Sequence, residues 1–258
     1  MTKAIDGTRI NIFPPEFEPY KNLIYVPLDL ETPTVNEEDF LKWFEAAHLK
    51  DHASEGNESD GVQLSGEYSK GLLPAQNNKN VYPWNIVYLH RHLRKTDNYE
   101  SCLTQFPTIK NYLDNLPFDS KASISILRQH PGVDVGIHTD YDLWFGFRFY
   151  LVNSSNARIF FQKAKTPNNT RLTAFDDNGK RIPWSKLIED EKVYASYPSP
   201  NCSFHLTCTH AVHGVESVPE DQSCSRITFF FTGKLNPEKY VELLEKSLKK
   251  YGDYAIWH

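Results

Sequence analysis

The sequence predicts a mainly β domain with flanking helices, arranged as a sandwich or jelly roll. Between about residues 120 and 235, short runs rich in Ile, Phe, Val, Tyr and Thr are broken by Pro, Gly and Asn, and helical patterns lie on both sides. With 258 residues and 40% hydrophobic content, one sizeable core is expected. We therefore expect a single domain over 1–258, with an N-terminal helical buttress (1–119), the β core and a C-terminal helix (236–252).

Three helices are predicted. Asn36 precedes three acidic residues and an apolar pattern with helical spacing, which predicts a helix over about 36–49. A second helix is expected over about 104–115 from the apolar stripe there. Asn236 as a cap, followed by Pro237 and a stripe of Tyr and Leu residues, predicts the C-terminal helix. The polar stretch 51–80 is expected to be a loop.

Six strands are predicted within the β core, because each run is rich in β-branched and aromatic residues and is bounded by turn residues. They cover residues 123–128, 143–152, 157–163, 193–197, 203–209 and 227–232. The Asp-Asp-Asn-Gly sequence at 176–179 predicts a tight turn. Many short strands at this spacing favour a sandwich or jelly roll over a parallel sheet.

Composition narrows the kind of partner. A net charge of -5 and a pI near 6.1 argue against a long nucleic-acid footprint. No run approaches the roughly 20 apolar residues of a membrane span, and no signal-peptide pattern is seen. The four cysteines, at 102, 202, 208 and 224, are too few for a disulfide framework and are expected to be reduced. We expect a soluble cytoplasmic protein whose partner is a small molecule or a peptide, with no nucleic acid and no membrane.

Two short segments carry candidate metal ligands. His138 and Asp140 are two residues apart, so in an extended segment both side chains project from one face and can reach one ion. The second segment contains His213, and a polar loop then leads into Arg226 and Thr228 on a predicted strand. Arg226 and Thr228 share a face of that strand, where a guanidinium beside a hydroxyl suits a carboxylate. Two imidazoles and one carboxylate form the ligand set typical of non-haem iron.

These residues resemble the pattern of the iron(II)- and 2-oxoglutarate-dependent oxygenases: His-x-Asp, a distant His, and a later Arg or Lys, often followed by Ser or Thr one residue further on. The resemblance covers about residues 122–235 and is to the hydroxylase branch, with its aspartyl/asparaginyl and prolyl hydroxylases. It implies a double-stranded β-helix, a cupin-like jelly roll buttressed by the terminal helices. It also implies that His138, Asp140 and His213 are catalytic and hold Fe(II), with positions left for 2-oxoglutarate and O2. Arg226 and Thr228 would bind the distal carboxylate of 2-oxoglutarate.

Two assignments have competitors in the sequence. Arg148, in the run 144–148, is an alternative carboxylate anchor, because some hydroxylases use an Arg on the strand after the first ligands. Arg226 is preferred. His210 competes with His213 as the third ligand, but the Gly-Val that follows His213 matches the family better.

The resemblance implies hydroxylation of an unactivated C–H bond. A carboxylate at Asp140 occupies the place where related halogenases leave room for chloride, and demethylation by hydroxylation of an N-methyl group would use the same site. Charged and aromatic residues around the first ligand segment favour a small polar substrate such as a free amino acid, while a peptidyl Asp, Asn or Pro remains an alternative. These neighbouring residues are Arg128, His130, Asp134, Tyr141, Asp142, Trp144 and Arg148.

A different class of function stays open. Cys202, Cys208, His210 and His213 have the donor types of a structural zinc, although their spacing departs from the usual close Cys pairs. In that case the chain would be a zinc-stapled binding domain. A jelly-roll binder without redox chemistry is a third reading, and it would not require Arg226.

Overall fold

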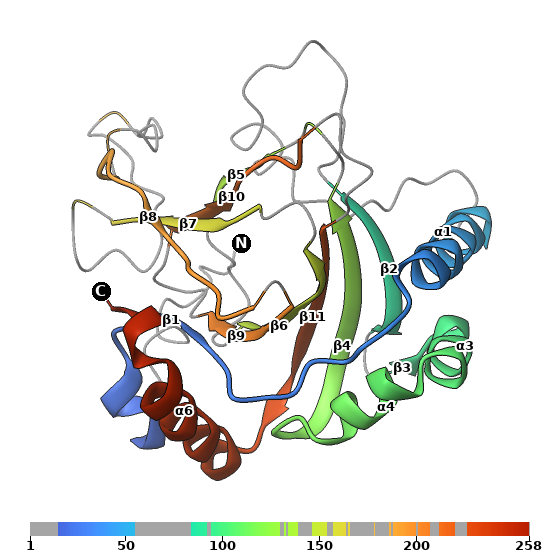
Figure 1. Ribbon diagram of the computed structural model, residues 1–258, viewed down its shortest axis with the longest axis horizontal. Helices are drawn as coiled ribbons and strands as arrows, with labels where there is room; N and C mark the ends of the chain where they lie inside the picture. The colour runs from blue at the N-terminus through green and yellow to red at the C-terminus, as the bar shows by residue number, and fades with distance from the viewer. Residues whose placement is uncertain are drawn as a thin grey trace.

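The computed structural model describes residues 15–54, 84–91, 94–129, 132, 134–138, 146–153, 157–163, 165, 178, 186, 188–199, 201–206, 212–219 and 226–257. Two antiparallel sheets face each other within this part of the chain (Figure 1). The larger sheet has eight strands in the order β12-β1-β9-β6-β11-β4-β2-β3, and the smaller has four in the order β5-β10-β7-β8.

The strands from β4 to β11 form a jelly roll. Along the chain they alternate between the sheets: β4, β6, β9 and β11 lie in the large sheet, and β5, β7, β8 and β10 lie in the small one. This alternation is the double-sheet arrangement of the jelly roll, and it confirms the predicted fold class. The strands are β4 (Phe118–Gln129), β5 (Val135–His138), β6 (Gly146–Asn153), β7 (Ile159–Gln162), β8 (Val193–Tyr194), β9 (Ser203–Leu206), β10 (Val212–Val215) and β11 (Arg226–Leu235).

The N-terminal part of the chain extends the large sheet. The strands β1 (Leu23–Pro27), β2 (Trp84–Arg91) and β3 (Arg94–Lys95) belong to it, as does the C-terminal β12 (Ile256–Trp257). All five residues of β1 are buried, because Leu23 and Val26 pack in the cluster under the helices while Ile24 and Tyr25 pack in the cluster between the sheets. The expectation that residues 1–119 form a helical buttress is therefore incomplete, since three strands come from this segment.

Helices cover the outer face of the large sheet (Figure 1). They are η2 (Pro15–Tyr20), α1 (Glu37–Ser54), α3 (Asp97–Gln105), α4 (Pro107–Asp114), α6 (Pro237–Tyr251) and η3 (Gly252–Tyr254). The helix expected at 104–115 corresponds to α4, with its first two residues at the end of α3, and the rest of α3 was not predicted. Phe106 has φ -126° and ψ 75°, outside the helical region, and Pro107, which lacks an N–H, starts α4. The predicted cap of α6 is confirmed, because the Asn236 side chain accepts a hydrogen bond from the Lys239 main-chain N–H at 3.1 Å.

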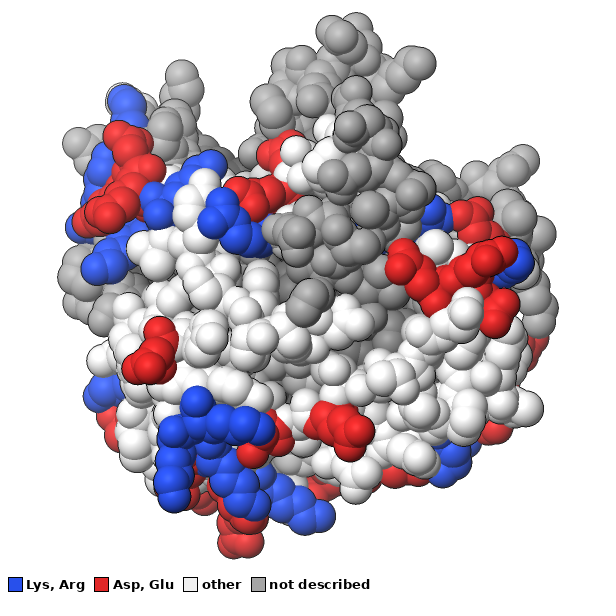
Figure 2. Space-filling model, viewed as in Figure 1, with Lys and Arg blue, Asp and Glu red and all other residues white. Residues whose placement is uncertain are grey.

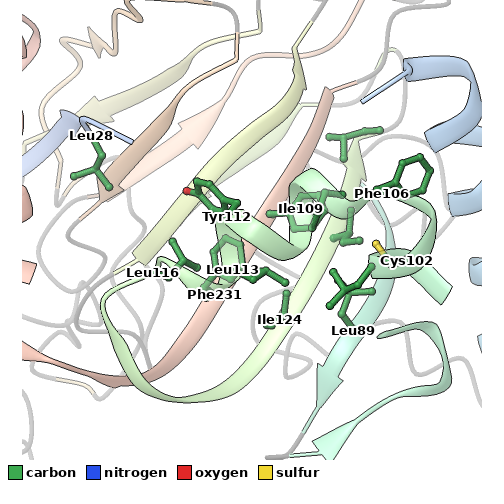
Figure 3. Close-up of a cluster of buried hydrophobic side chains, with 14 of the residues drawn as sticks. Leu28, Leu89, Cys102, Phe106, Ile109, Tyr112, Leu113, Leu116, Ile124 and Phe231 are labelled. Carbon is green, nitrogen blue, oxygen red and sulfur yellow. The ribbon is translucent and has the colours of Figure 1, made fainter. Parts of the chain in front are cut away.

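Alternate residues of β11 face this helical layer. Ile227, Phe229 and Phe231 are buried in one cluster with Ile109 and Leu113 of α4, and Figure 3 shows the α4 side chains packed over Phe231. Burying a side chain of this size stabilises the fold by about 1.5–3 kcal/mol relative to leaving it exposed. Because successive strand residues point to opposite faces, Arg226, Thr228 and Phe230 face the space between the two sheets.

The space between the sheets is filled with aromatic side chains at one end. Tyr25 of β1, Phe161 of β7 and Phe204 of β9 pack together, with ring centroids 6.0 Å apart for Tyr25–Phe161 and 5.8 Å for Tyr25–Phe204. Val135 of β5 and Val215 of β10 join the same buried cluster. This apolar core packs the two sheets against each other.

The predicted strands near 123–128, 157–163, 193–197, 203–209 and 227–232 are confirmed as β4, β7, β8, β9 and β11, with shifted ends. The strand expected at 143–152 is β6, which the structure describes from Gly146. The strands β5 and β10 were not predicted. Of the turn expected at 176–179, only residue 178 is described, as a turn. Residues 55–80 of the expected loop lie outside the described residues, whereas 51–54 complete α1.

Acidic and basic side chains form mixed groups on the surface shown in Figure 2. This face carries no broad region of one sign among its described residues, in keeping with the net charge of -5. None of the helices in the described ranges is long and apolar enough to cross a membrane.

Candidate functional site

Two of the predicted metal ligands lie on neighbouring strands of the small sheet. The Cα atoms of His138, the last residue of β5, and His213, in β10, are direct partners across this antiparallel pair. Directly opposite positions share a face of the sheet, with Cβ atoms about 4.5–5.5 Å apart. The fold thus brings together two segments that are remote in the sequence. The side chain of His138 and the whole of Asp140 lie outside what the structure describes.

His213 is buried with 0% exposure at the centre of this pairing. Phe161 of β7 is its direct partner on the other side, and the two rings lie 6.3 Å apart between centroids. Phe161 belongs to the apolar core between the sheets, so position 213 lies on the inner face of the small sheet.

Gly214 explains how β10 fits between β5 and β7. A Cβ atom at this position would lie 2.5 Å from Cζ of Phe160 and 2.9 Å from the main-chain oxygen of Val135. The ring could shift, but the carbonyl belongs to the neighbouring strand. Only glycine therefore allows this close approach, which holds the backbone of His213 against β5.

The predicted carboxylate anchor lies on the opposite sheet. Arg226 and Thr228 are 7% and 6% exposed and occupy inner-face positions of β11. Within the described residues, Thr228 Oγ1 is buried and has no hydrogen-bond partner. A buried hydroxyl without a partner costs free energy, so a ligand that bonds it would recover that cost.

The structure adds a residue that sequence reasoning missed. Gln129, the last residue of β4, is directly opposite Arg226 and only 2% exposed. Its Oε1 accepts a hydrogen bond from Arg226 Nη1 at 3.2 Å, and its Nε2 donates to the main-chain oxygen of Glu216 at 2.9 Å. The available signal was the alternation along β4, which puts Gln129 on the face opposite to Ile124 and Ile126.

Arg148, the competing anchor, lies on β6. Its Cα partners are Phe230 of β11 and Phe204 of β9, so position 148 is also on the inner face. Its side chain lies outside what the structure describes, and the register leaves both arginines as candidates. Arg128, one of the expected substrate contacts, lies on the outer face instead and forms an ion pair with Glu45 of α1.

A partly exposed ion pair holds the C-terminal end of β10. Glu216 forms an ion pair with Arg158, with 3.0 Å between Nη2 and Oε1, and its main-chain N–H donates to the Arg158 oxygen at 3.0 Å. The hydrogen bonds from Arg158 lower the pKa of the Glu216 carboxyl, and the same pairing raises the pKa of Arg158. This pair ties the end of β10 to the start of β7.

The zinc alternative gains no support from Cys202. This residue is buried in the apolar cluster with Tyr25 and Phe204, and burial raises the pKa of its thiol to about 12. Cys102 is likewise a buried free thiol whose pKa is raised to about 12. Both match the environment of a small hydrophobic side chain. Cys208 and His210 lie outside the described residues, as does Cys224.

Within the described ranges, no group of three or more His, Cys, Asp and Glu side chains is placed to hold a metal. Asp140 and the side chain of His138 lie outside those ranges, so this observation does not bear on the ligand set expected from the sequence. The donor chemistry of the His138/His213 pairing fits a metal that prefers imidazole and carboxylate.

No protein-family model matches the sequence, and no curated protein sequence matches it. Among solved structures, the chain is similar to a non-haem α-ketoglutarate-dependent carbocyclase, SnoK, from nogalamycin biosynthesis (15% identity, 86% of this chain and 85% of that chain covered, TM-score 0.42). It is also similar to a Pseudomonas putida prolyl-4-hydroxylase (12% identity, 83% and 95% covered, TM-score 0.33). A third is a 2OG-Fe(II) oxygenase family oxidoreductase from Burkholderia pseudomallei (10% identity, 61% and 74% covered, TM-score 0.35).

The identity to each of these three proteins is 15% or lower. The chain is a jelly-roll protein in which His213 on one inner face and Arg226, Thr228 and Gln129 on the other are buried polar residues of a largely apolar interior.

Proposed function

We propose that this protein is an iron(II)- and 2-oxoglutarate-dependent dioxygenase that hydroxylates an unactivated C–H bond of a small polar substrate. The observation that carries the proposal is the pairing of His138 with His213 on the inner face of the small sheet, opposite a large sheet that carries Arg226 and Thr228. A jelly-roll binder without redox chemistry would not require Arg226, which is buried here with 7% exposure.

His138, Asp140 and His213 would hold the iron. Two imidazoles and one carboxylate leave open positions on the metal, which is the ligand arrangement of non-haem iron oxygenases. When bound, iron(II) together with 2-oxoglutarate and O2 supplies the oxidising power for C–H hydroxylation. The chain's own contribution is to fix the ligand segments, and the close packing at Gly214 does this for β10.

Arg226 and Thr228 would bind the distal carboxylate of 2-oxoglutarate. A guanidinium matches a carboxylate with two parallel hydrogen bonds, and the Thr228 hydroxyl would add a third donor. Both side chains are buried, so water competes little with the ligand and the electrostatic attraction is stronger than at the surface. Arg226 and Thr228 would thus hold the cosubstrate by the carboxylate opposite to its 2-oxo acid group.

The substrate is proposed to be a free amino acid or a derivative of one. The apolar cluster between the sheets includes Val135 of β5 and Val215 of β10, so the proposed ligand segments adjoin apolar as well as polar groups. Asp134, which precedes β5 and is partly exposed, is a described charged group beside those segments. A peptidyl Asp, Asn or Pro would bind the same ligand segments from the mouth of the jelly roll.

One experiment separates the proposal from its alternatives. Purified protein is loaded with iron(II) without oxygen, and 2-oxoglutarate is added while the visible spectrum is recorded. A weak charge-transfer band that needs both additions is expected, followed by succinate release when oxygen and an amino-acid panel are supplied. Tightly held zinc that depends on Cys202 and Cys208, with no such band, would reject the proposal in favour of a zinc-stapled domain.

A further inference from the structure

We propose that Gln129 is a positioning residue that aligns the guanidinium of Arg226 for the cosubstrate carboxylate and couples it to the end of β10. The inference rests on the proposed function and extends it to a residue that does not itself bind metal or substrate. Gln129 is the direct cross-strand partner of Arg226 and is 2% exposed, so its amide is shielded from water.

The orientation of the Gln129 amide is fixed by its partners. The guanidinium of Arg226 can only donate hydrogen bonds, and the main-chain oxygen of Glu216 can only accept them. The amide oxygen therefore faces Arg226 at 3.2 Å and the amide nitrogen faces Glu216 at 2.9 Å. A rotated amide would set donor against donor and acceptor against acceptor, so both contacts are formed together or lost together.

A neutral partner suits an arginine that must bind an anion. The guanidinium has five N–H donors in one plane, so the bond from Nη1 to Gln129 constrains the orientation of that plane, and the neutral amide adds no negative charge beside it. A glutamate at position 129 would offer its own negative charge to Arg226 and compete with the ligand. Gln129 thus orients the cation without neutralising it.

The second hydrogen bond links the anchor to the strand that carries His213. Glu216 directly follows β10, and its side chain is held by Arg158 at the start of β7. Gln129 therefore connects the inner face of the large sheet to a braced end of β10 in the small sheet. The Gln129 side chain thus connects Arg226, which would bind the carboxylate, to the end of the strand that carries His213, the proposed metal ligand.

The test measures binding without turnover. Protein loaded with manganese(II) in place of iron is titrated calorimetrically with 2-oxoglutarate, and separately with pyruvate, which has the 2-oxo acid group but no distal carboxylate. The variants are Gln129→Met and Gln129→Glu. Gln162→Met is the matched control. Gln162 is also a buried glutamine, and its Nε2 donates a hydrogen bond to the main-chain oxygen of Glu189 at 2.8 Å instead of linking to Arg226.

We expect Gln129→Met to weaken 2-oxoglutarate binding by about ten- to hundredfold, the change that losing one hydrogen bond to a charged group brings. Gln129→Glu should weaken it at least as much, although it has nearly the same shape. Pyruvate and manganese affinities should stay unchanged in both variants, and Gln162→Met should bind 2-oxoglutarate like the unmodified protein.

Three results would overturn the inference. Equal 2-oxoglutarate affinity in the Gln129 variants and the unmodified protein would reject the positioning role of Gln129. The proposed function would not be affected. Equal losses for 2-oxoglutarate and pyruvate would show that Gln129 only supports the fold. If the unmodified protein binds no 2-oxoglutarate, the proposed function fails and this inference fails with it.

Discussion

His138 and His213 are direct Cα partners across β5 and β10, on the face of the small sheet that looks toward the large one. The register is irregular between His213 and Val215, so the pairing is set by local packing rather than by a long uniform ladder. At Gly214, between these two residues, an added Cβ atom would lie 2.9 Å from the main-chain oxygen of Val135. This relationship gives the metal proposal a structural basis that can be tested residue by residue.

Replacing Asp140 with alanine is expected to abolish succinate-coupled turnover and to weaken iron(II) binding, because the metal would lose its only anionic protein ligand. Iron affinity is measured by equilibrium dialysis without oxygen, alongside succinate release. Full activity and unchanged iron affinity in this variant would remove Asp140 from the ligand set.

Replacing Arg226 with alanine is expected to raise the 2-oxoglutarate KM by orders of magnitude, because leaving a buried carboxylate without its charged partner costs about 2–5 kcal/mol. The control is Arg128→Ala, on the adjacent strand but on the outer face, where the arginine pairs with Glu45. Arg148→Ala is assayed in parallel. If it produces the larger rise in KM, the anchor is Arg148.

Replacing Gly214 with alanine is expected to destabilise the fold by about 1–3 kcal/mol, the usual cost of forcing an extra carbon into a packed site. The new Cβ would approach the Val135 oxygen to 2.9 Å. Gly252→Ala is the matched control, because nothing lies within 4 Å of a Cβ there and its φ of -57° suits alanine. Urea unfolding of the two variants measures the difference, and equal stabilities would contradict the proposed close approach.

Stability should fall as the pH is lowered from about 6.5 to about 4, because of His205. Burial lowers the pKa of this imidazole from 6.5 to about 4 in the folded protein. Between these values the unfolded chain binds a proton that the folded one excludes, so the free energy of unfolding drops by up to about 1.4 kcal/mol per pH unit. His205 also hydrogen-bonds the Tyr240 hydroxyl.

The His205→Gln variant checks the source of this pH dependence. It lacks a group that titrates in this range, so its urea-unfolding free energy should vary less between pH 6.5 and 4 than that of the unmodified protein. An equally steep slope in both proteins would assign the acid sensitivity to other groups.

Local features of the sequence predicted local structure well. Asn236 and Pro237 define the start of α6, because capping depends on neighbours three or four residues away. The strands β4, β7, β9 and β11 were also predicted from local sequence, because each predicted run contains several β-branched or aromatic residues. Most of α3 was missed, because its sequence Asp-Asn-Tyr-Glu-Ser-Cys-Leu-Thr-Gln is largely polar and its buried positions include Asn98.

The parts that were missed depend on distant partners. The strands β5 and β10 are as short as β7 and β9, but each contains a Gly and a His and neither contains Phe, Tyr or Trp, so the sequence shows no strand pattern there; they form because they pair with each other, and β10 also pairs with β7. The β1 and β2 segments join the large sheet at positions that no nearby residue indicates. Gln129 has a role only because the register of β4 and β11 places it beside Arg226.

The sequence by itself determined the fold class, the terminal helices and the residue types able to hold iron and a dicarboxylate. Only the tertiary structure decided that positions 138 and 213 lie opposite each other, that Arg226 and Thr228 face the interior, and that Arg128 faces the helices. The physical reason is that side-chain periodicity assigns residues to faces within one strand. Which face is inside, and which strands are neighbours, is set by burial of apolar surface over the whole chain.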